Sequence, residues 1–117
     1  MIERKRGHIV AISSMAAKIT TPLATAYSAS KFGVDGFMSS LFDELCVDDH
    51  DEYIKLTTVF PTFINTRKEL GDMLDKVGDI SPRMTPKYAA NIIVDGMLLN
   101  KRCFLVPSHS WFLIIAQ

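Results

Sequence analysis

This sequence of 117 residues contains only two cysteines and one tryptophan, and its formal net charge is zero. The two cysteines, Cys46 and Cys103, lie far apart, and neither a disulfide framework nor a zinc site is predicted from them. The three histidines share no metal-ligand spacing with each other or with the cysteines. The 13 basic residues balance the 13 acidic residues, so no charge excess favours nucleic acid as a partner. Because no apolar run reaches the roughly 18 residues of a membrane-spanning helix, we expect a soluble or peripheral intracellular protein.

The first half of the chain alternates between strand and helix patterns. The chain opens with a charged turn that ends at Gly7 and is similar to the last turn of a helix. The apolar run 9–12 then predicts a buried strand over 8–13. A small-residue loop follows over 15–25, where Pro22 disfavours a helix. A long helix is then predicted over 26–46, because apolar residues recur every three or four positions: Val34, Phe37, Met38, Leu41, Phe42, Leu45 and Cys46.

The second half continues this alternation. A strand is expected over 54–60, ending at Pro61, and a helix over 66–77. Another helix begins after Thr85 as N-cap, with Pro86 at its first position, and a last strand covers 103–106. The order strand, helix, strand, two helices, strand predicts an α/β fold of one domain, in which helices flank a parallel sheet of about three strands.

Three polar residues stand where such a sheet would hold a ligand. Ser14 follows the first buried strand, and ligands of open α/β sheets bind at the carboxyl edge. Tyr27 and Lys31 lie four residues apart, one turn of the next helix. A cation beside a phenol favours the phenolate, so the pair suits general acid/base catalysis. The alternative is a surface tyrosine packed over a lysine stem.

These residues carry a resemblance. Gly7-His8-Ile9-Val10, then Ser14, and Tyr27-Ser28-Ala29-Ser30-Lys31 thirteen residues after it closely resemble the catalytic core of short-chain dehydrogenases/reductases. The resemblance covers residues 1–117 as the C-terminal half of a Rossmann-type, doubly wound dinucleotide-binding domain whose N-terminal half is absent. It implies that Tyr27 exchanges a proton with the substrate oxygen, that Lys31 bonds the nicotinamide ribose and that Ser14 polarises the reacting carbonyl.

A second segment is similar to the Pro-Gly-x-Val-x-Thr segment of this family: Pro61-Thr62-Phe63-Ile64-Asn65-Thr66. The resemblance implies a cofactor-binding role for Pro61 beside the nicotinamide, for the Ile64 backbone and for the Thr66 side chain. Simple strand termination remains the alternative for Pro61. With its aromatic residue, this loop is similar to the corresponding loop of the retinol and 17β-hydroxysteroid dehydrogenase-like branch. Four apolar residues either line a substrate pocket or pack in the core: Phe63, Leu70, Met73 and Met84.

The resemblance implies hydride transfer between NAD or NADP and a small lipophilic alcohol or carbonyl of retinoid, steroid or fatty-acyl type. The glycine-rich turn that holds the cofactor pyrophosphate does not occur in this sequence, so we expect the isolated chain to be inactive. A truncated, non-catalytic interaction module and a purely structural domain are the alternatives. The family also implies a homodimer of the full-length protein. For the apolar tail around Trp111, it implies peripheral contact with the endoplasmic reticulum membrane or a lipid droplet.

Overall fold

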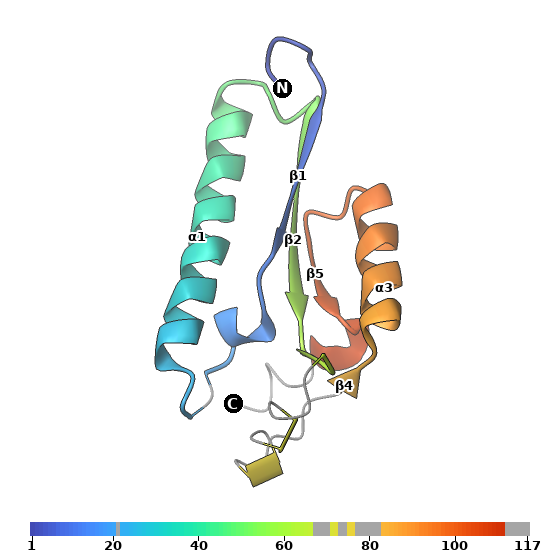
Figure 1. Cartoon of the computed structure of the whole chain (residues 1–117). Coiled ribbons are helices and arrows are strands. Elements are labelled where there is room, and N and C mark those ends of the chain that lie inside the picture. Colours follow the sequence, from blue (N-terminus) through green and yellow to red (C-terminus); the bar gives the residue numbers. More distant parts are fainter. Residues whose placement is uncertain (21, 67–70, 73–74, 77–82, 112–117) are drawn as a thin grey trace.

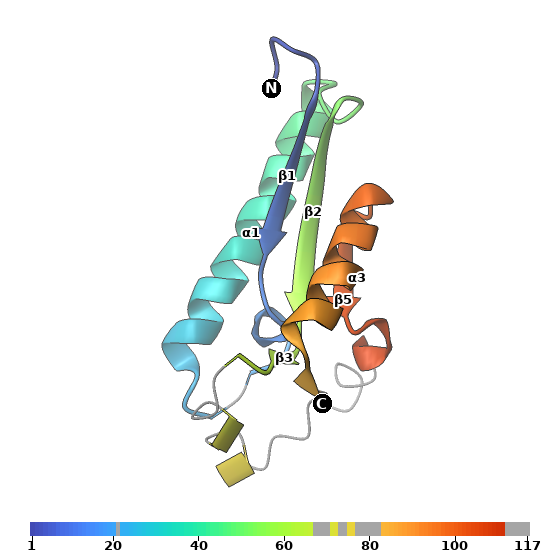
Figure 2. The same cartoon turned by 45° about the vertical axis from the view of Figure 1, so that its right-hand side comes forward.

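A parallel sheet with one long helix on each face organises the chain. The computed structural model describes residues 1–20, 22–66, 71–72, 75–76 and 83–111. Strands β1 (Gly7–Ile12), β2 (Ile54–Pro61) and β5 (Cys103–Val106) pair in the order β1-β2-β5. Helix α1 (Thr25–Val47) covers one face and helix α3 (Pro86–Leu98) covers the other, as Figures 1 and 2 show. The predicted α/β class with a parallel sheet is confirmed.

Short elements gather at the carboxyl ends of the strands, at the lower end of Figure 1. The 3-10 helix η1 (Met15–Ala17) follows β1, and a second one, η2 (Ser108–Trp111), follows β5. A separate pair of parallel strands is formed by β3 (Phe63–Ile64) and β4 (Arg83–Met84). The end of the sheet where an α/β protein binds ligands therefore also carries most of the irregular structure.

The core has two layers because β2 is covered on both faces. Between α1 and the sheet lie buried residues of one cluster, namely Met38, Leu45, Ile54 and Leu56. On the α3 side lies a second cluster, namely Val59, Met84, Ala89 and Val106. Alternate residues of β2 contribute to the two clusters, as the period of two in a strand requires. The result is a central strand that is packed on both faces and ends at the predicted site.

Both long helices agree closely with the sequence patterns. Helix α3 begins as predicted, since the Thr85 side chain accepts a hydrogen bond from the Tyr88 backbone N–H at 3.3 Å and Pro86 occupies the first turn. Helix α1 buries Met38 and Leu45, but Phe37 is 65% exposed. Phe37 lies at the edge of the apolar stripe, so its inclusion in the buried face was wrong.

Two further expectations need correction. Pro22 does not keep the whole loop non-helical, because η1 forms upstream of it, where a proline imposes no restriction. The opening segment is a turn over residues 2–5 rather than a helix end, and its left-handed residue is Lys5 (φ 43°) instead of Gly7. Most of the predicted helix 66–77 lies outside the described residues, as does the tail after Trp111.

The sheet is open at β1. In the part of the chain that the structure describes, β1 pairs with β2 and has no neighbour on its other side. The radius of gyration is 15.6 Å, against about 13 Å for a compact domain of this length.

Among the described residues, no helix combines the length and the apolar character needed to cross a bilayer.

Candidate functional site

The loop after β1 fixes Ser14 at the edge of the sheet. The Ser13 backbone N–H donates to the Val59 carbonyl at 2.8 Å, which extends the β1–β2 ladder by one residue. Ser14 is then extended (φ −165°, ψ 158°) and caps η1, where its Oγ accepts a hydrogen bond from the Ala16 N–H at 3.1 Å. A serine hydroxyl also carries one donor hydrogen. That hydrogen has no acceptor among the described residues, so the group can still donate.

The predicted pair lies on the first two turns of α1. The Lys31 Nζ atom lies 5.6 Å from the centroid of the Tyr27 ring, within the range of a cation–π contact. The same Nζ donates to the carbonyl of Ile12, the last residue of β1, at 3.1 Å. The Tyr27 side chain is 51% exposed. The structure therefore brings the phenol and the ammonium together, and attaches the ammonium to the strand that leads to Ser14.

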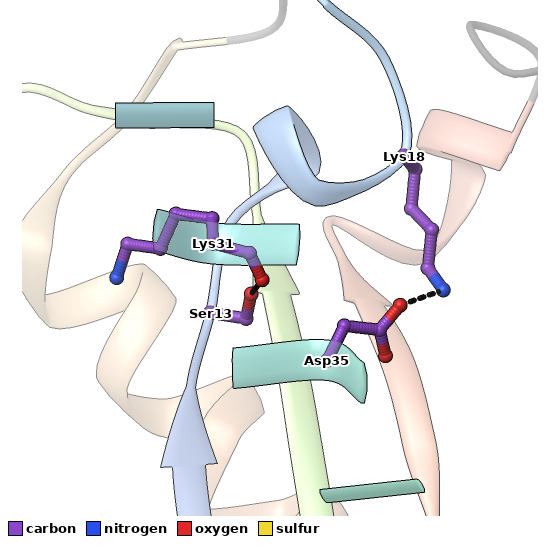
Figure 3. Close-up of polar contacts among 4 residues, drawn as sticks. All are labelled: Ser13, Lys18, Lys31 and Asp35. Carbon is purple, nitrogen blue, oxygen red and sulfur yellow. Dashed lines mark hydrogen bonds and ion pairs between the residues drawn. The ribbon is translucent and has the colours of Figure 1, made fainter. Parts of the chain in front are cut away.

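A second contact joins the helix to this strand. The Ser13 hydroxyl donates to the backbone carbonyl of Lys31 at 3.1 Å, as Figure 3 shows. Ser13 is 3% exposed, so water has little access to this hydrogen bond. Because Ser13 precedes Ser14 directly, both contacts of Lys31 involve residues within two positions of the predicted catalytic serine. All three predicted catalytic residues thus belong to one strand–turn–helix unit.

The predicted cofactor segment lies at the end of β2. Pro61 is buried and is the last residue of β2, where it is paired in register with Val106. Ile64 packs against the core cluster on the α3 side, and its carbonyl accepts from the Thr66 N–H at 2.8 Å. Thr66 is exposed. Strand termination at Pro61 is observed, and it is compatible with a role beside a ligand at the same edge.

The residues present leave hydrogen-bond donors free for a dinucleotide. An ammonium has three donors, and within the described residues Lys31 Nζ uses one of them, on Ile12. The exposed Thr66 hydroxyl has no partner there either. This donor set fits ribose hydroxyl and carboxamide groups. No group of three His, Cys, Asp or Glu side chains in the described ranges is arranged to hold a metal.

Of the four residues predicted to line a pocket or pack in the core, the structure describes Phe63 and Met84. Met84 is 4% exposed and belongs to the core cluster on the α3 side, so the core-packing alternative is confirmed for it. Phe63 is half-buried, with the Arg83 guanidinium 5.9 Å from the centroid of its ring. Leu70 and Met73 lie outside the described residues.

The sequence patterns missed an ion pair beside the site. Lys18 Nζ contacts Asp35 Oδ2 at 2.6 Å (Figure 3) and lies 4.5 Å from the centroid of the Phe60 ring. Lys18 follows Ser14 by four residues, whereas Asp35 lies one turn after Lys31 on α1. The two partners are 17 positions apart across an irregular loop, so no periodic pattern in the sequence relates them. The sequence analysis did not assign a role to Ser13, because the resemblance to the family concerns the neighbouring Ser14.

The thiol of Cys46 does not extend the site. Cys46 lies near the opposite end of α1 from Tyr27. Desolvation, together with the nearby carboxylates of Asp51 and Asp43, raises the pKa of this thiol above its ordinary value. A raised pKa keeps the thiol protonated near neutral pH. Cys46 is therefore a poor nucleophile.

Comparison with known proteins gives a consistent result. The family model described as short chain dehydrogenase matches residues 1–73. Estradiol 17-beta-dehydrogenase 11 of Macaca fascicularis is 31% identical over 117 residues, which is 100% of this chain and 37% of that protein. Epidermal retinol dehydrogenase 2 of Mus musculus is 34% identical over 117 residues, again 100% of this chain and 37% of that protein. The chain therefore spans little more than a third of the length of these relatives.

A solved structure supports the same fold. A 3-oxoacyl-[acyl-carrier protein] reductase with bound NAD from Brucella melitensis superposes with a TM-score of 0.63 at 28% identity. The superposition covers 83% of this chain and 36% of that chain. The matched part is again about a third of a longer protein.

Proposed function

Because this chain belongs to the short-chain dehydrogenase family, we propose that it provides the reaction centre of an NAD- or NADP-dependent oxidoreductase. The observation that carries the proposal is the position of Lys31 Nζ, which contacts both the Tyr27 ring and the Ile12 carbonyl beside Ser14. A phenol, an ammonium and a hydroxyl at the carboxyl edge of a parallel sheet form a suitable acid/base site. The bound dinucleotide supplies or accepts the hydride.

Each of the three side chains has a separate role in this proposal. During carbonyl reduction Tyr27 donates its phenolic proton to the substrate oxygen, and during alcohol oxidation its phenolate accepts that proton. The Ser14 hydroxyl donates a hydrogen bond to the same oxygen and polarises it. Lys31 places a positive charge beside the Tyr27 ring and donates to the nicotinamide ribose. The exposure of Tyr27 and the free donor hydrogen of Ser14 support these assignments.

The cofactor contacts extend to the end of β2. We assign Pro61, the Ile64 backbone and the Thr66 side chain to the nicotinamide, with Tyr27 and Lys31 on the ribose side. The exposed, unpartnered hydroxyl of Thr66 supports this assignment within the described residues. A glycine-rich turn for the pyrophosphate does not occur in these 117 residues. The isolated chain is therefore proposed to lack turnover, and activity is assigned to a longer protein that contains it.

The proposed substrate is a lipophilic alcohol or carbonyl, of retinoid, steroid or fatty-acyl type. Two relatives that align along the whole chain are named as a steroid and a retinol dehydrogenase, which supports this class. The partly apolar surroundings of the β2 end, with Phe63 half-buried beside it, are compatible with such a substrate.

We also propose peripheral contact of the full-length protein with the endoplasmic reticulum membrane or a lipid droplet, which a flotation assay with vesicles tests directly.

A homodimer of the full-length protein is proposed as well. The outer surface of α1 carries exposed aromatic side chains, with Phe32 45% and Phe37 65% exposed. Aromatic residues are enriched in protein interfaces. Sedimentation of the full-length protein, with and without Phe37→Ser, tests this assignment. A monomer for the unsubstituted protein contradicts it.

The experiment that tests the function uses the full-length protein. Calorimetric titration with NAD and with NADP measures cofactor binding, and the absorbance of the reduced nicotinamide measures turnover with a retinol, a steroid alcohol and a fatty-acyl ketone. We expect saturable binding of one dinucleotide and turnover of at least one lipophilic substrate. Binding of neither dinucleotide contradicts the oxidoreductase and favours the non-catalytic interaction module.

A further inference from the structure

Two contacts hold the loop that carries Ser14, one on each side of it. Before Ser14, the Ser13 hydroxyl donates to the Lys31 carbonyl at 3.1 Å. After Ser14, the Lys18 ammonium pairs with Asp35 at 2.6 Å. The two anchor points on α1 are four residues apart, which is one helical turn on one face. Figure 3 shows both contacts running from the loop to successive turns of the helix.

The same two residues also reach β2. The Ser13 backbone N–H donates to the Val59 carbonyl at 2.8 Å, and Lys18 Nζ lies over the Phe60 ring at 4.5 Å. Val59 and Phe60 are almost fully buried, at 0% and 2% exposure, so they are fixed reference points in the core. The loop with Ser14 is thus held simultaneously to the helix of Tyr27 and Lys31 and to the strand that ends at Pro61.

The two contacts differ in their exposure to solvent. Ser13 is 3% exposed, so loss of its hydroxyl leaves the Lys31 carbonyl without that donor in a dry environment. The side chains of Lys18 and Asp35 keep 36% and 21% exposure, so their ion pair is partly screened by solvent. We therefore expect Ser13 to contribute more to the local geometry than the ion pair does.

We propose that Ser13 and the Lys18–Asp35 pair are positioning residues that set the separation between the Ser14 hydroxyl and the Tyr27 phenol. This inference rests on the proposed function, since a separation matters only where both groups act on one substrate oxygen. Neither Ser13 nor Lys18 needs to touch the substrate or the cofactor. Each acts through the loop, and a small displacement of a catalytic group lowers turnover far more than it lowers binding.

The test compares side chains of equal shape at position 13 of the full-length protein. Ser13→Thr keeps the hydroxyl, whereas Ser13→Val has the same shape without it. We expect Ser13→Val to lower kcat about tenfold or more, with KM for the dinucleotide changed by less than about twofold. Ser13→Thr is expected to keep most of the activity. Ser40→Ala is the control, because it removes an exposed hydroxyl from the same helix.

A surface substitution tests the second contact without disturbing the core. Lys18→Met keeps the stem and removes the charge, and we expect kcat to fall about threefold to tenfold while Lys18→Arg retains it. Equal activity of Ser13→Val and Ser13→Thr, with Lys18→Met unimpaired, overturns the inference while the function stands. A parallel loss in Ser13→Thr and Ser13→Val also overturns it. An unsubstituted full-length protein without turnover refutes the proposed function itself, and the positioning role with it.

Discussion

Removal of the Tyr27 phenolic oxygen is the most direct test of the chemistry. Tyr27→Phe deletes one oxygen atom and retains the ring, so the contact with Lys31 Nζ, 5.6 Å from the ring centroid, is preserved. The Tyr27 side chain is 51% exposed, and its hydroxyl has no hydrogen-bond partner within the described residues. The substitution therefore leaves no buried polar group unpaired, and we expect a change in unfolding free energy within about 0.5 kcal/mol.

The expected loss of turnover follows from the role of the group. A positioned general acid/base contributes about 10²–10⁴-fold to a rate, which corresponds to roughly 3–5 kcal/mol of transition-state stabilisation. Since Ser14 and Lys31 remain in Tyr27→Phe, we expect kcat to fall by about 10³-fold. The dissociation constant of the dinucleotide is expected to change little, because Lys31 keeps its donors.

The assay follows the absorbance of the reduced nicotinamide with full-length Tyr27→Phe, and calorimetry measures dinucleotide binding separately. Tyr88→Phe is the matched control, because Tyr88 is 50% exposed and lies in the first turn of α3. We expect Tyr88→Phe to behave like the unsubstituted protein in both measurements. Turnover by Tyr27→Phe within a few-fold of the unsubstituted rate refutes the assignment of Tyr27 as the proton donor.

Three further predictions concern binding, packing and association. Lys31→Met in the full-length protein is expected to weaken dinucleotide binding by roughly 10–100-fold, the equivalent of a charged hydrogen bond of about 1.5–3 kcal/mol; calorimetry with unchanged affinity contradicts this. A Cβ at Gly96 would overlap the ring of Phe104, whereas at Gly36 it would meet nothing within 4 Å. Thermal denaturation should therefore show Gly96→Ala destabilised by about 1–3 kcal/mol and Gly36→Ala stabilised by up to about 1 kcal/mol, and equal effects refute the packing argument. The isolated 117-residue chain is expected to self-associate through the open edge of β1 and its exposed apolar side chains, and a monodisperse monomer in sedimentation, with cooperative melting, shows otherwise.

Periodicity and capping predicted the main elements well because both are local. Thr85 and Pro86 carry enough information to start α3, and the apolar spacing from Val34 to Leu45 is sufficient to define α1. The three strands of the main sheet were found because each is a short apolar or β-branched run that ends at a proline or a polar loop, whereas the two-residue strands β3 and β4 were not predicted. The one-turn separation of Tyr27 and Lys31 follows from the helix alone, and the structure confirms that their side chains meet.

Other features depend on contacts that no local pattern encodes. The Lys18–Asp35 pair and the Ser13–Lys31 hydrogen bond join residues 17 and 18 positions apart, so both depend on the packing of α1 against the loop after β1. Phe37 satisfies the helical period yet remains 65% exposed, because it lies at the edge of the apolar stripe of α1. Tertiary packing decides these cases, so the sequence patterns identified the proposed catalytic pair and missed the residues that contact the loop around Ser14.

The division of the core by the sheet has a consequence for function. The three proposed catalytic residues belong to the loop after β1 and to α1. Their supporting contacts reach Val59 and Phe60 of β2. Helix α3 packs on the opposite face, where Ala89 and Val106 contact the other layer of the core. The central strand β2 lies between the two layers, so we expect a packing defect under α3 that does not involve Val59 to change the unfolding free energy more than the position of Ser14 relative to Tyr27. Stability and turnover are therefore separable only away from Val59 and Ile64, which belong to the α3-side layer. Defects elsewhere under α3 should lower the melting temperature with kcat retained, whereas defects between the loop and α1 should lower kcat.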